Sequence, residues 1–227
     1  MSIIVTWYGH ATLGMKVGAY QLLIDPFFTG NPAASTTADK VQADFILVSH
    51  GHGDHVGDAI KIAKRTGAMV ISNAEIADWF EKQGIEKTHG QHLGGGFMYP
   101  FGYLKLTFAL HGSALPDGSN GGNPAGFLLT AEGKKIYLAG DTGLFGDMQL
   151  IGEEGLDLAM LPIGDNYTMG PDDALRATKM LQAKHIIPIH YNTFDLLKQD
   201  AGAWAKRVEA ETKSKVHILK PGESFSL

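Results

Sequence analysis

Short apolar runs recur along the whole chain, and most of them are bounded by Gly, Asp or His. Continuous apolar runs of three to seven residues are typical of strands that are buried on both faces. The runs that predict strands are residues 3–8, 20–24, 45–48, 68–71, 104–110, 127–129, 135–138, 156–161, 186–189 and 216–219.

Amphipathic segments between these runs predict helices over residues 73–83, 171–181 and 201–212. The first begins with Asn73, which suits a helix cap, and the second begins with a proline followed by two aspartates near the positive end of the helix dipole. This alternation predicts a layered α/β protein with sheets inside and helices outside. Because the sequence shows no linker, charge block or repeat, we expect residues 1–227 to form a single domain.

The amino-acid composition limits which metal ligands and which binding partners the chain can have. The chain has no cysteine, which excludes disulfides, thiolate metal ligands and cysteine nucleophiles, so a metal site has to use imidazole and carboxylate groups. The net charge of −5 does not favour a nucleic-acid-binding protein.

The sequence also indicates a location. No apolar run approaches the ~18 to 20 residues needed to span a bilayer. Residues 1–7 have no basic region before their apolar residues and no small-residue cleavage site, and they read as the start of a first strand. We therefore expect a cytoplasmic protein.

The strongest chemical signal is the segment His50-Gly51-His52-Gly53-Asp54-His55, which follows an apolar run. A six-residue window of this chain would hold about 0.3 histidine on average, and this one holds three. His50 and His52 are two residues apart, so an extended or turning backbone can aim both rings at one ion. Asp54 and His55 follow where the chain would bend into a helix and can face a second ion, and the glycines allow the tight bends.

Three further candidate ligands, His111, Asp141 and His190, stand directly after apolar runs. Ligand sites in α/β proteins collect at the carboxyl ends of strands, so these positions are expected to converge with the histidine-rich segment. The remaining histidines at 89, 92, 185 and 217 lie outside the pattern and are expected to have no role in it.

These residues resemble the motifs of the metallo-β-lactamase superfamily, and the resemblance covers essentially the whole chain. Within it the chain is similar to a branch of little-characterised metal-dependent hydrolases related to ascorbate-6-phosphate lactonase and N-acyl-phosphatidylethanolamine phospholipase D. The segments that carry this closer resemblance are residues 7–12, 25–26, 161–165 and 189–194. The resemblance implies a four-layer αββα sandwich, in which two mixed sheets are flanked by helices and the metals lie at one edge of the sheets.

The resemblance also implies a ligand set for two divalent ions. His50, His52 and His111 would hold the first ion, Asp54, His55 and His190 the second, and Asp141 would bridge them. Nitrogen and oxygen ligands fit Zn, Mn, Fe, Ni or Co, of which we expect zinc first and manganese second.

Two such ions lower the pKa of a bridging water, so that hydroxide is available at neutral pH. The bridging hydroxide would then attack the substrate, and Asp54 would orient this hydroxide. Asp141 stands where β-lactamases of this fold have a cysteine ligand, which favours phosphoesters or lactones over β-lactams. We therefore expect hydrolysis of an ester, either a phosphodiester or a (phosphorylated) lactone of a small metabolite.

Four other polar residues are candidates for substrate contact or for support of the ligands: His10, Asp25, Asp165 and Asn192. Each also has a plain structural interpretation, such as a core histidine or an Asp-Pro turn. The glycine- and proline-rich stretches 26–38 and 112–124 are expected to frame the entrance to the site.

Alternative functions remain open at this point. Transfer-RNA 3′ endonucleases share the motif, although the acidic net charge makes nucleic acid an unlikely partner. Redox di-iron proteins of this fold usually have a glutamate where His52 stands and a flavin domain for which the chain has no room. A further alternative function is that of a non-catalytic metal-binding protein. Separately, the chain could form a homo-oligomer.

Overall fold

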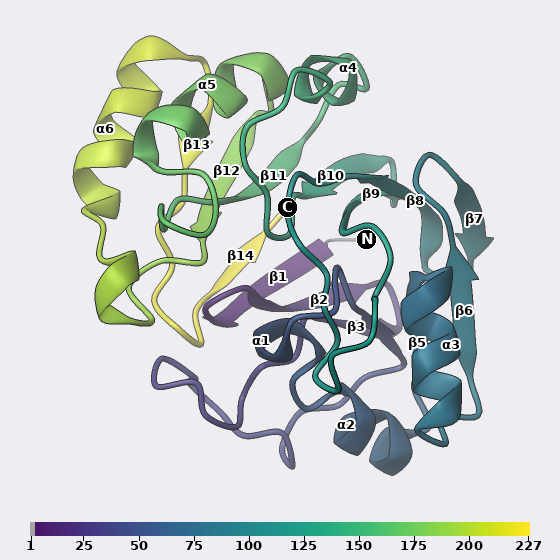
Figure 1. Cartoon of the computed structure of the whole chain (residues 1–227). Helices are drawn as coiled ribbons and strands as arrows, with labels where there is room; N and C mark the ends of the chain where they lie inside the picture. The colour runs from purple at the N-terminus through teal and green to yellow at the C-terminus, as the bar shows by residue number, and fades with distance from the viewer. Residues whose placement is uncertain (1–2) are drawn as a thin grey trace.

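The apolar runs form two β-sheets that pack face to face, with helices on their outer sides (Figure 1). The computed structural model describes residues 3–227, and residues 1 and 2 of the expected first strand lie outside the described part. Within residues 3–227, fourteen strands are divided equally between the two sheets.

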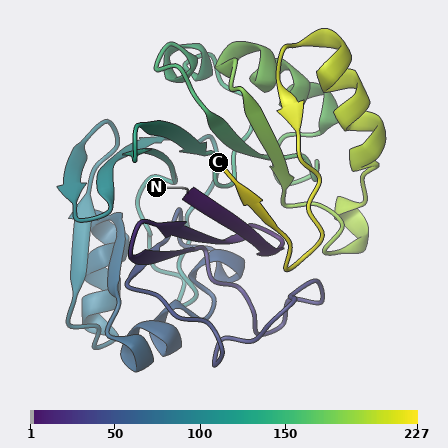
Figure 2. The ribbon, with the colours of Figure 1, turned by 180° about the vertical axis from the view of Figure 1, so that it is seen from behind.

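The first sheet has the strand order β14-β1-β2-β3-β4-β5-β6. Its strands are β1 (Ile3–Gly9), β2 (Thr12–Val17), β3 (Tyr20–Ile24), β4 (Phe45–Leu47), β5 (Met69–Asn73), β6 (Thr88–Gln91) and β14 (Ser224–Ser226). Strands β1 to β3 are antiparallel to one another, and β3 to β6 are parallel. The C-terminal strand β14 pairs with β1, which brings the two ends of the described chain together (Figure 2).

The second sheet has the order β13-β12-β11-β10-β9-β8-β7. It contains β7 (Gly96–Tyr99), β8 (Gly102–Phe108), β9 (Ala125–Ala131), β10 (Lys134–Leu138), β11 (Leu158–Pro162), β12 (His185–Ile189) and β13 (Lys215–Val216). Strands β7 to β10 are antiparallel and β10 to β13 are parallel, so both sheets are mixed.

The helices complete the four layers. They are α1 (Gly53–Val56), α2 (Ala59–Thr66), α3 (Ala74–Lys82), α4 (Met148–Gly152), α5 (Pro171–Leu181) and α6 (Ala201–Glu211), with a 3₁₀ turn η1 (Asp195–Leu197). Helices α2 and α3 pack on the first sheet, and α5 and α6 on the second. The expected αββα sandwich is confirmed. None of the helices within residues 3–227 is both long and apolar enough to cross a membrane.

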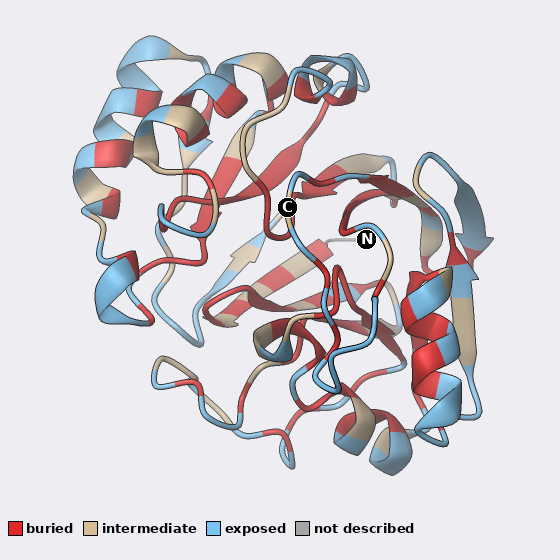
Figure 3. Cartoon of the chain, viewed as in Figure 1, coloured by how far each residue is buried: buried red, intermediate tan, exposed pale blue. Residues whose placement is uncertain are grey.

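Burial explains why the central strands read as unbroken apolar runs (Figure 3). In β4, Phe45 and Leu47 face the second sheet, whereas Ile46 between them faces the helices. In β5, Ile71 faces the second sheet and Val70 faces the helices. Because both faces of these strands are covered, polar residues are excluded from both.

Several elements were absent from the sequence-based prediction. Strand β2 contains Gly14 and an exposed Lys16, and β14 has only three residues, two of them exposed serines. Both strands are held by pairing with distant partners, which local hydrophobicity does not reveal. The predicted strand at 216–219 is the two-residue β13.

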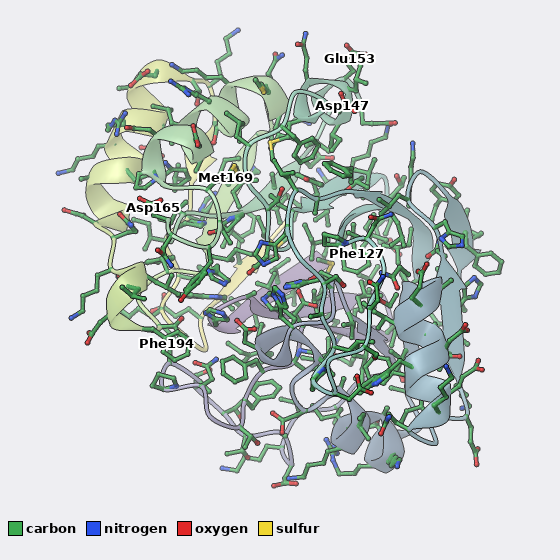
Figure 4. The ribbon with its side chains drawn as sticks, in the orientation of Figure 1. Phe127, Asp147, Glu153, Asp165, Met169 and Phe194 are labelled. Carbon is green, nitrogen blue, oxygen red and sulfur yellow. The ribbon has the colours of Figure 1, made fainter. Side chains whose placement is uncertain are left out.

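The packing between the sheets leads to a first prediction. Phe127 on β9 is fully buried in the core that both sheets share (Figure 4). Replacing it with alanine leaves a cavity, so Phe127→Ala should lower the free energy of unfolding by about 3–5 kcal/mol. Urea denaturation measures the change, and Leu150→Ala, at a side chain that is 60% exposed, should change it by less than about 0.5 kcal/mol. Equal effects of the two substitutions would contradict this assignment of the core.

Candidate metal centre

Polar side chains follow the carboxyl ends of strands from both sheets and meet at one edge of the sandwich. Strands β1, β3 and β4 of the first sheet lead to this edge, as do β8, β10 and β12 of the second. The side chains that follow these strands are His10, Asp25, His50, His111, Asp141 and His190. The turn of α1 adds Asp54 and His55, as the sequence indicated.

The backbone at these strand ends turns abruptly into the left-handed region. Eight non-glycine residues within residues 3–227 have a positive φ, and six of them lie in segments around this edge. These six are His10, Asp25, Asp165, Asn166, His190 and Asn192. Such a conformation is uncommon for residues with a side chain and concentrates at functional sites.

One group of donors consists of His50, His52 and His111. Nδ1 of His52 lies 3.0 Å from Nε2 of His50 and 3.2 Å from Nε2 of His111. The three side chains offer ligand atoms that all lie within 4.8 Å of one another.

A second group joins Asp54 to His55, His190 and His10, again with ligand atoms within 4.8 Å of one another. Asp141 lies between the two groups. Its Oδ2 is 3.0 Å from Nε2 of His190, 3.3 Å from that of His55 and 3.7 Å from that of His111. This one carboxylate therefore contacts histidines of both groups.

Buried hydrogen bonds fix the orientation of His50 and His55. Asp25 accepts hydrogen bonds from Nδ1 of His55 (2.8 Å) and from the hydroxyl (2.6 Å) and backbone N–H (2.7 Å) of Ser49. Since the Ser49 hydroxyl donates to Asp25, its oxygen accepts from Nδ1 of His50 at 2.9 Å. Both rings thus carry a proton on Nδ1, which leaves Nε2 directed at the cluster.

Sequence reasoning assigned no role to Ser49. The available signal was its position directly before His50, between an apolar run and the ligand motif.

His10 orients Asp54. Burial lowers the pKa of His10 to about 4, so the ring is neutral. The hydrogen bond to Asp54 opposes this shift, and the charges of His190 and His55 add to it. Its Nε2–H donates to Oδ2 of Asp54 (3.1 Å), and the hydroxyl of Thr193 donates to its Nδ1 (2.9 Å).

Comparison with known proteins agrees with this geometry. A family model described as a β-lactamase superfamily domain matches residues 20–191. The chain belongs to the β-lactamase superfamily. A UPF0173 metal-dependent hydrolase from Heliobacterium modesticaldum is 52% identical, over 98% of this chain and 97% of the relative. Another from Thermus thermophilus is 49% identical, over 98% of each.

A solved structure extends the comparison. Igni18, described as a metallo hydrolase from the hyperthermophilic archaeon Ignicoccus hospitalis, superposes with a TM-score of 0.93 at 35% identity, over 100% of this chain and 99% of that one. This superfamily member is therefore a metal-dependent hydrolase with the metallo-β-lactamase fold.

The charges of the clustered histidines and aspartates suit a bound cation. Burial alone would raise the pKa of Asp141, but His190 and His55 hold it well below its usual value. Burial would lower the pKa of His55, yet the carboxylates of Asp141 and Asp25 raise it well above its usual value. Burial would also raise the pKa of Asp54, which its hydrogen bond to His10 and the charge of His55 instead lower. A cation bound between these groups would replace the proton on His55.

Buried side-chain atoms that lack a hydrogen-bond partner also indicate that these residues fit a metal ion. Within the described chain, Nε2 of His55, Oδ1 of Asp141 and Nδ1 of His190 are buried without a hydrogen-bond partner. Buried polar atoms normally have partners, and imidazole and carboxylate atoms that lack them suit a divalent ion.

The other candidates lie around this cluster. Asp165 is exposed, and its carboxylate accepts from the backbone of Asn166 in the loop before α5 (Figure 4). Asn192 also closes a loop, because its side chain accepts from the N–H of Gln199 (2.8 Å) and donates to the carbonyl of that residue. The structure brings neither side chain into the groups described above.

The expected loops do approach the site. In the stretch 26–38, the Phe27 ring lies 5.7 Å from that of His10. In the stretch 112–124, the Ser113 hydroxyl accepts from the N–H of Gly51. The histidines at 89, 92, 185 and 217 lie outside both donor groups.

The support from Asp25 gives a second prediction. Asp25→Asn removes the charge that fixes His55 and Ser49, so the affinity for metal should fall about 10- to 100-fold, measured by competition with a chelator. Asp157→Asn is a matched control, because Asp157 is also a buried aspartate but pairs with Lys184 away from the cluster, and its affinity should match that of the wild type. An Asp25→Asn variant with wild-type affinity would contradict the proposed support.

A third prediction concerns the backbone beneath His190. A Cβ on Gly164 would lie 2.1 Å from the carbonyl oxygen of His190, so Gly164→Ala must displace this residue. We expect a lower melting temperature and weaker metal binding. Gly146→Ala is the control, because no atom lies within 4 Å of its added Cβ, and it should change neither measurement. Identical behaviour of the two variants would show that His190 does not need this close approach.

Proposed function

We propose that this chain hydrolyses an ester bond of a small molecule, a phosphodiester or a lactone, at a centre of two divalent metal ions. The observation that carries the proposal is the position of Asp141, whose Oδ2 lies within 3.7 Å of three histidine Nε2 atoms that belong to both donor groups. A carboxylate between two sets of histidines suits a centre that binds two ions.

In this proposal each ion has its own donors. His50, His52 and His111 hold one ion, Asp54, His55 and His190 hold the other, and Asp141 contacts both. The donors are nitrogen and oxygen atoms, and the chain has no cysteine, which suits zinc, with manganese, iron, nickel and cobalt as alternatives.

Bound ions of this kind acidify water at neutral pH and polarise the oxygen of an electrophile. The residues of the chain supply the rest. The Asp54 side chain is 36% exposed, and its lowered pKa keeps it ionised, so its carboxylate can accept a hydrogen bond from a water molecule and orient it toward the substrate. The neutral His10 holds Oδ2 of that carboxylate and so fixes the direction in which Asp54 faces the substrate.

The proposal treats residues 1–227 as one domain. Its support is the core, in which residues of both sheets form one continuous cluster from Ile3 to Val208.

The test of this function combines metal analysis with activity, and it is the fourth prediction. Elemental analysis should find about two metal ions per chain, and the loaded protein should hydrolyse an activated ester, lactone or phosphodiester. Asp54→Ala and His111→Ala should each lower kcat/KM by more than about 100-fold, because each removes a ligand.

His89→Ala is the control, since His89 lies on β6 against Phe97, outside the donor groups, and should retain activity. Dialysis against a chelator should abolish turnover, and added metal should restore it. Full activity in both Asp54→Ala and His111→Ala would overturn the proposed centre.

A further inference from the structure

Positively charged side chains are missing from the segments that surround the metal centre. These segments are residues 9–12, 25–33, 49–58, 109–124, 139–146, 163–170 and 189–197, and all 19 Lys and Arg residues of the chain lie outside them. The next cation along the chain is Lys198. Its side chain is 74% exposed, and its Nζ is held 2.8 Å from the carboxylate of Asp195.

This distribution bears on the substrate. Proteins recognise a phosphate or carboxylate group with Arg forks or Lys ammonium groups, which form charge-assisted hydrogen bonds. Here a charged group distant from the scissile bond would meet no such partner in the segments around the centre. The chain therefore favours a substrate whose recognition group is uncharged.

Apolar side chains occupy the same surroundings. The ring of Phe194 is 43% exposed and lies 5.8 Å from that of His10, and the Phe27 ring lies 5.7 Å from the same imidazole. Leu110 directly precedes His111, is 52% exposed, and its N–H is held by the hydroxyl of Thr142, which follows Asp141. Exposed apolar groups beside a reactive centre are typical of a binding surface.

We propose that the substrate is an uncharged carboxylic ester or lactone with an apolar arm, which Phe194 and Leu110 contact. This inference rests on the proposed hydrolase function and chooses the lactone or ester over the phosphorylated substrates. Phe194 lies beside His10, and Leu110 is exposed directly before His111 in the chain, so each of the two donor groups has an exposed apolar residue in or beside its segment.

The fifth prediction is a dependence of rate on the length of the apolar arm. For the metal-loaded protein with p-nitrophenyl acetate, butanoate and hexanoate, kcat/KM should rise about two- to fourfold for each methylene group. Phe194→Ala and Leu110→Ala should flatten this dependence. Met98→Ala should keep the wild-type dependence, because Met98 is 66% exposed but lies on β7, outside the segments around the centre.

Charge gives a second, independent measurement. Mono-p-nitrophenyl succinate and p-nitrophenyl pentanoate are similar in length, but only the succinate ends in a carboxylate, and we expect it to react at least about tenfold more slowly. Phe194→Lys places a cation beside the centre and should raise the ratio of succinate to pentanoate turnover, whereas Met98→Lys should not.

Binding to the metal-free protein separates recognition from catalysis. Titration calorimetry with neutral hexanamide should give a weaker affinity in Phe194→Ala and Leu110→Ala than in the wild type and in Met98→Ala. Thermal melts of each variant show whether a loss comes from unfolding, and a loss of binding in a folded variant supports the contact.

The outcomes distinguish this inference from the function on which it rests. If bis(p-nitrophenyl) phosphate or the succinate ester is the better substrate, the chain is a hydrolase but the apolar substrate is wrong. A rate that does not depend on chain length, with hexanamide binding unchanged in both alanine variants, would also overturn it. If no ester, lactone or phosphodiester is hydrolysed at two bound metals per chain, both proposals fail.

Discussion

The carboxylate of Asp25 lies at the end of β3 and is 1% exposed, so its charge has to be compensated inside the protein. Three donors do this, namely two from Ser49 and one from His55, and through Ser49 the same carboxylate also fixes His50. One buried interaction thus links β3 to the histidine-rich turn after β4. Without it, the two imidazoles would be free to turn their donor atoms away from the cluster.

The edge of the sandwich tolerates this concentration of buried polar groups because strands of both sheets end there. A strand end releases the backbone from the sheet, and at His10, Asp25 and His190 the released residue adopts a left-handed conformation. Such residues are strained by of order 1–3 kcal/mol each and persist only where the surroundings hold them. Here the carbonyl of His10 accepts from the N–H of His190, so two of these turns support each other across the two sheets.

The sequence predicted the central elements of the fold better than its edges. Strands β4, β5, β11 and β12 are covered on both faces, and their apolar runs were therefore visible without a partner. Strands β2 and β14 depend on pairing with β1, which lies far from β14 in the sequence, and their own residues carry little signal. Local pattern records burial, but it does not record which distant strand supplies the hydrogen bonds.

For the site, the sequence alone determined which residues are candidate donors, because histidines and aspartates directly after apolar runs mark strand ends regardless of how the sheets pack. Only the tertiary structure decided how those donors meet. It placed Asp141 between two groups of histidines, recruited Ser49 and Asp25 as supports, and used Asn192 to close a loop. It also set the Phe194 ring beside His10 and left Leu110, directly before His111, exposed. Apart from the local loop at Asn192, these contacts join residues tens or hundreds of positions apart, and their distances follow from the packing of two sheets, which local sequence does not encode.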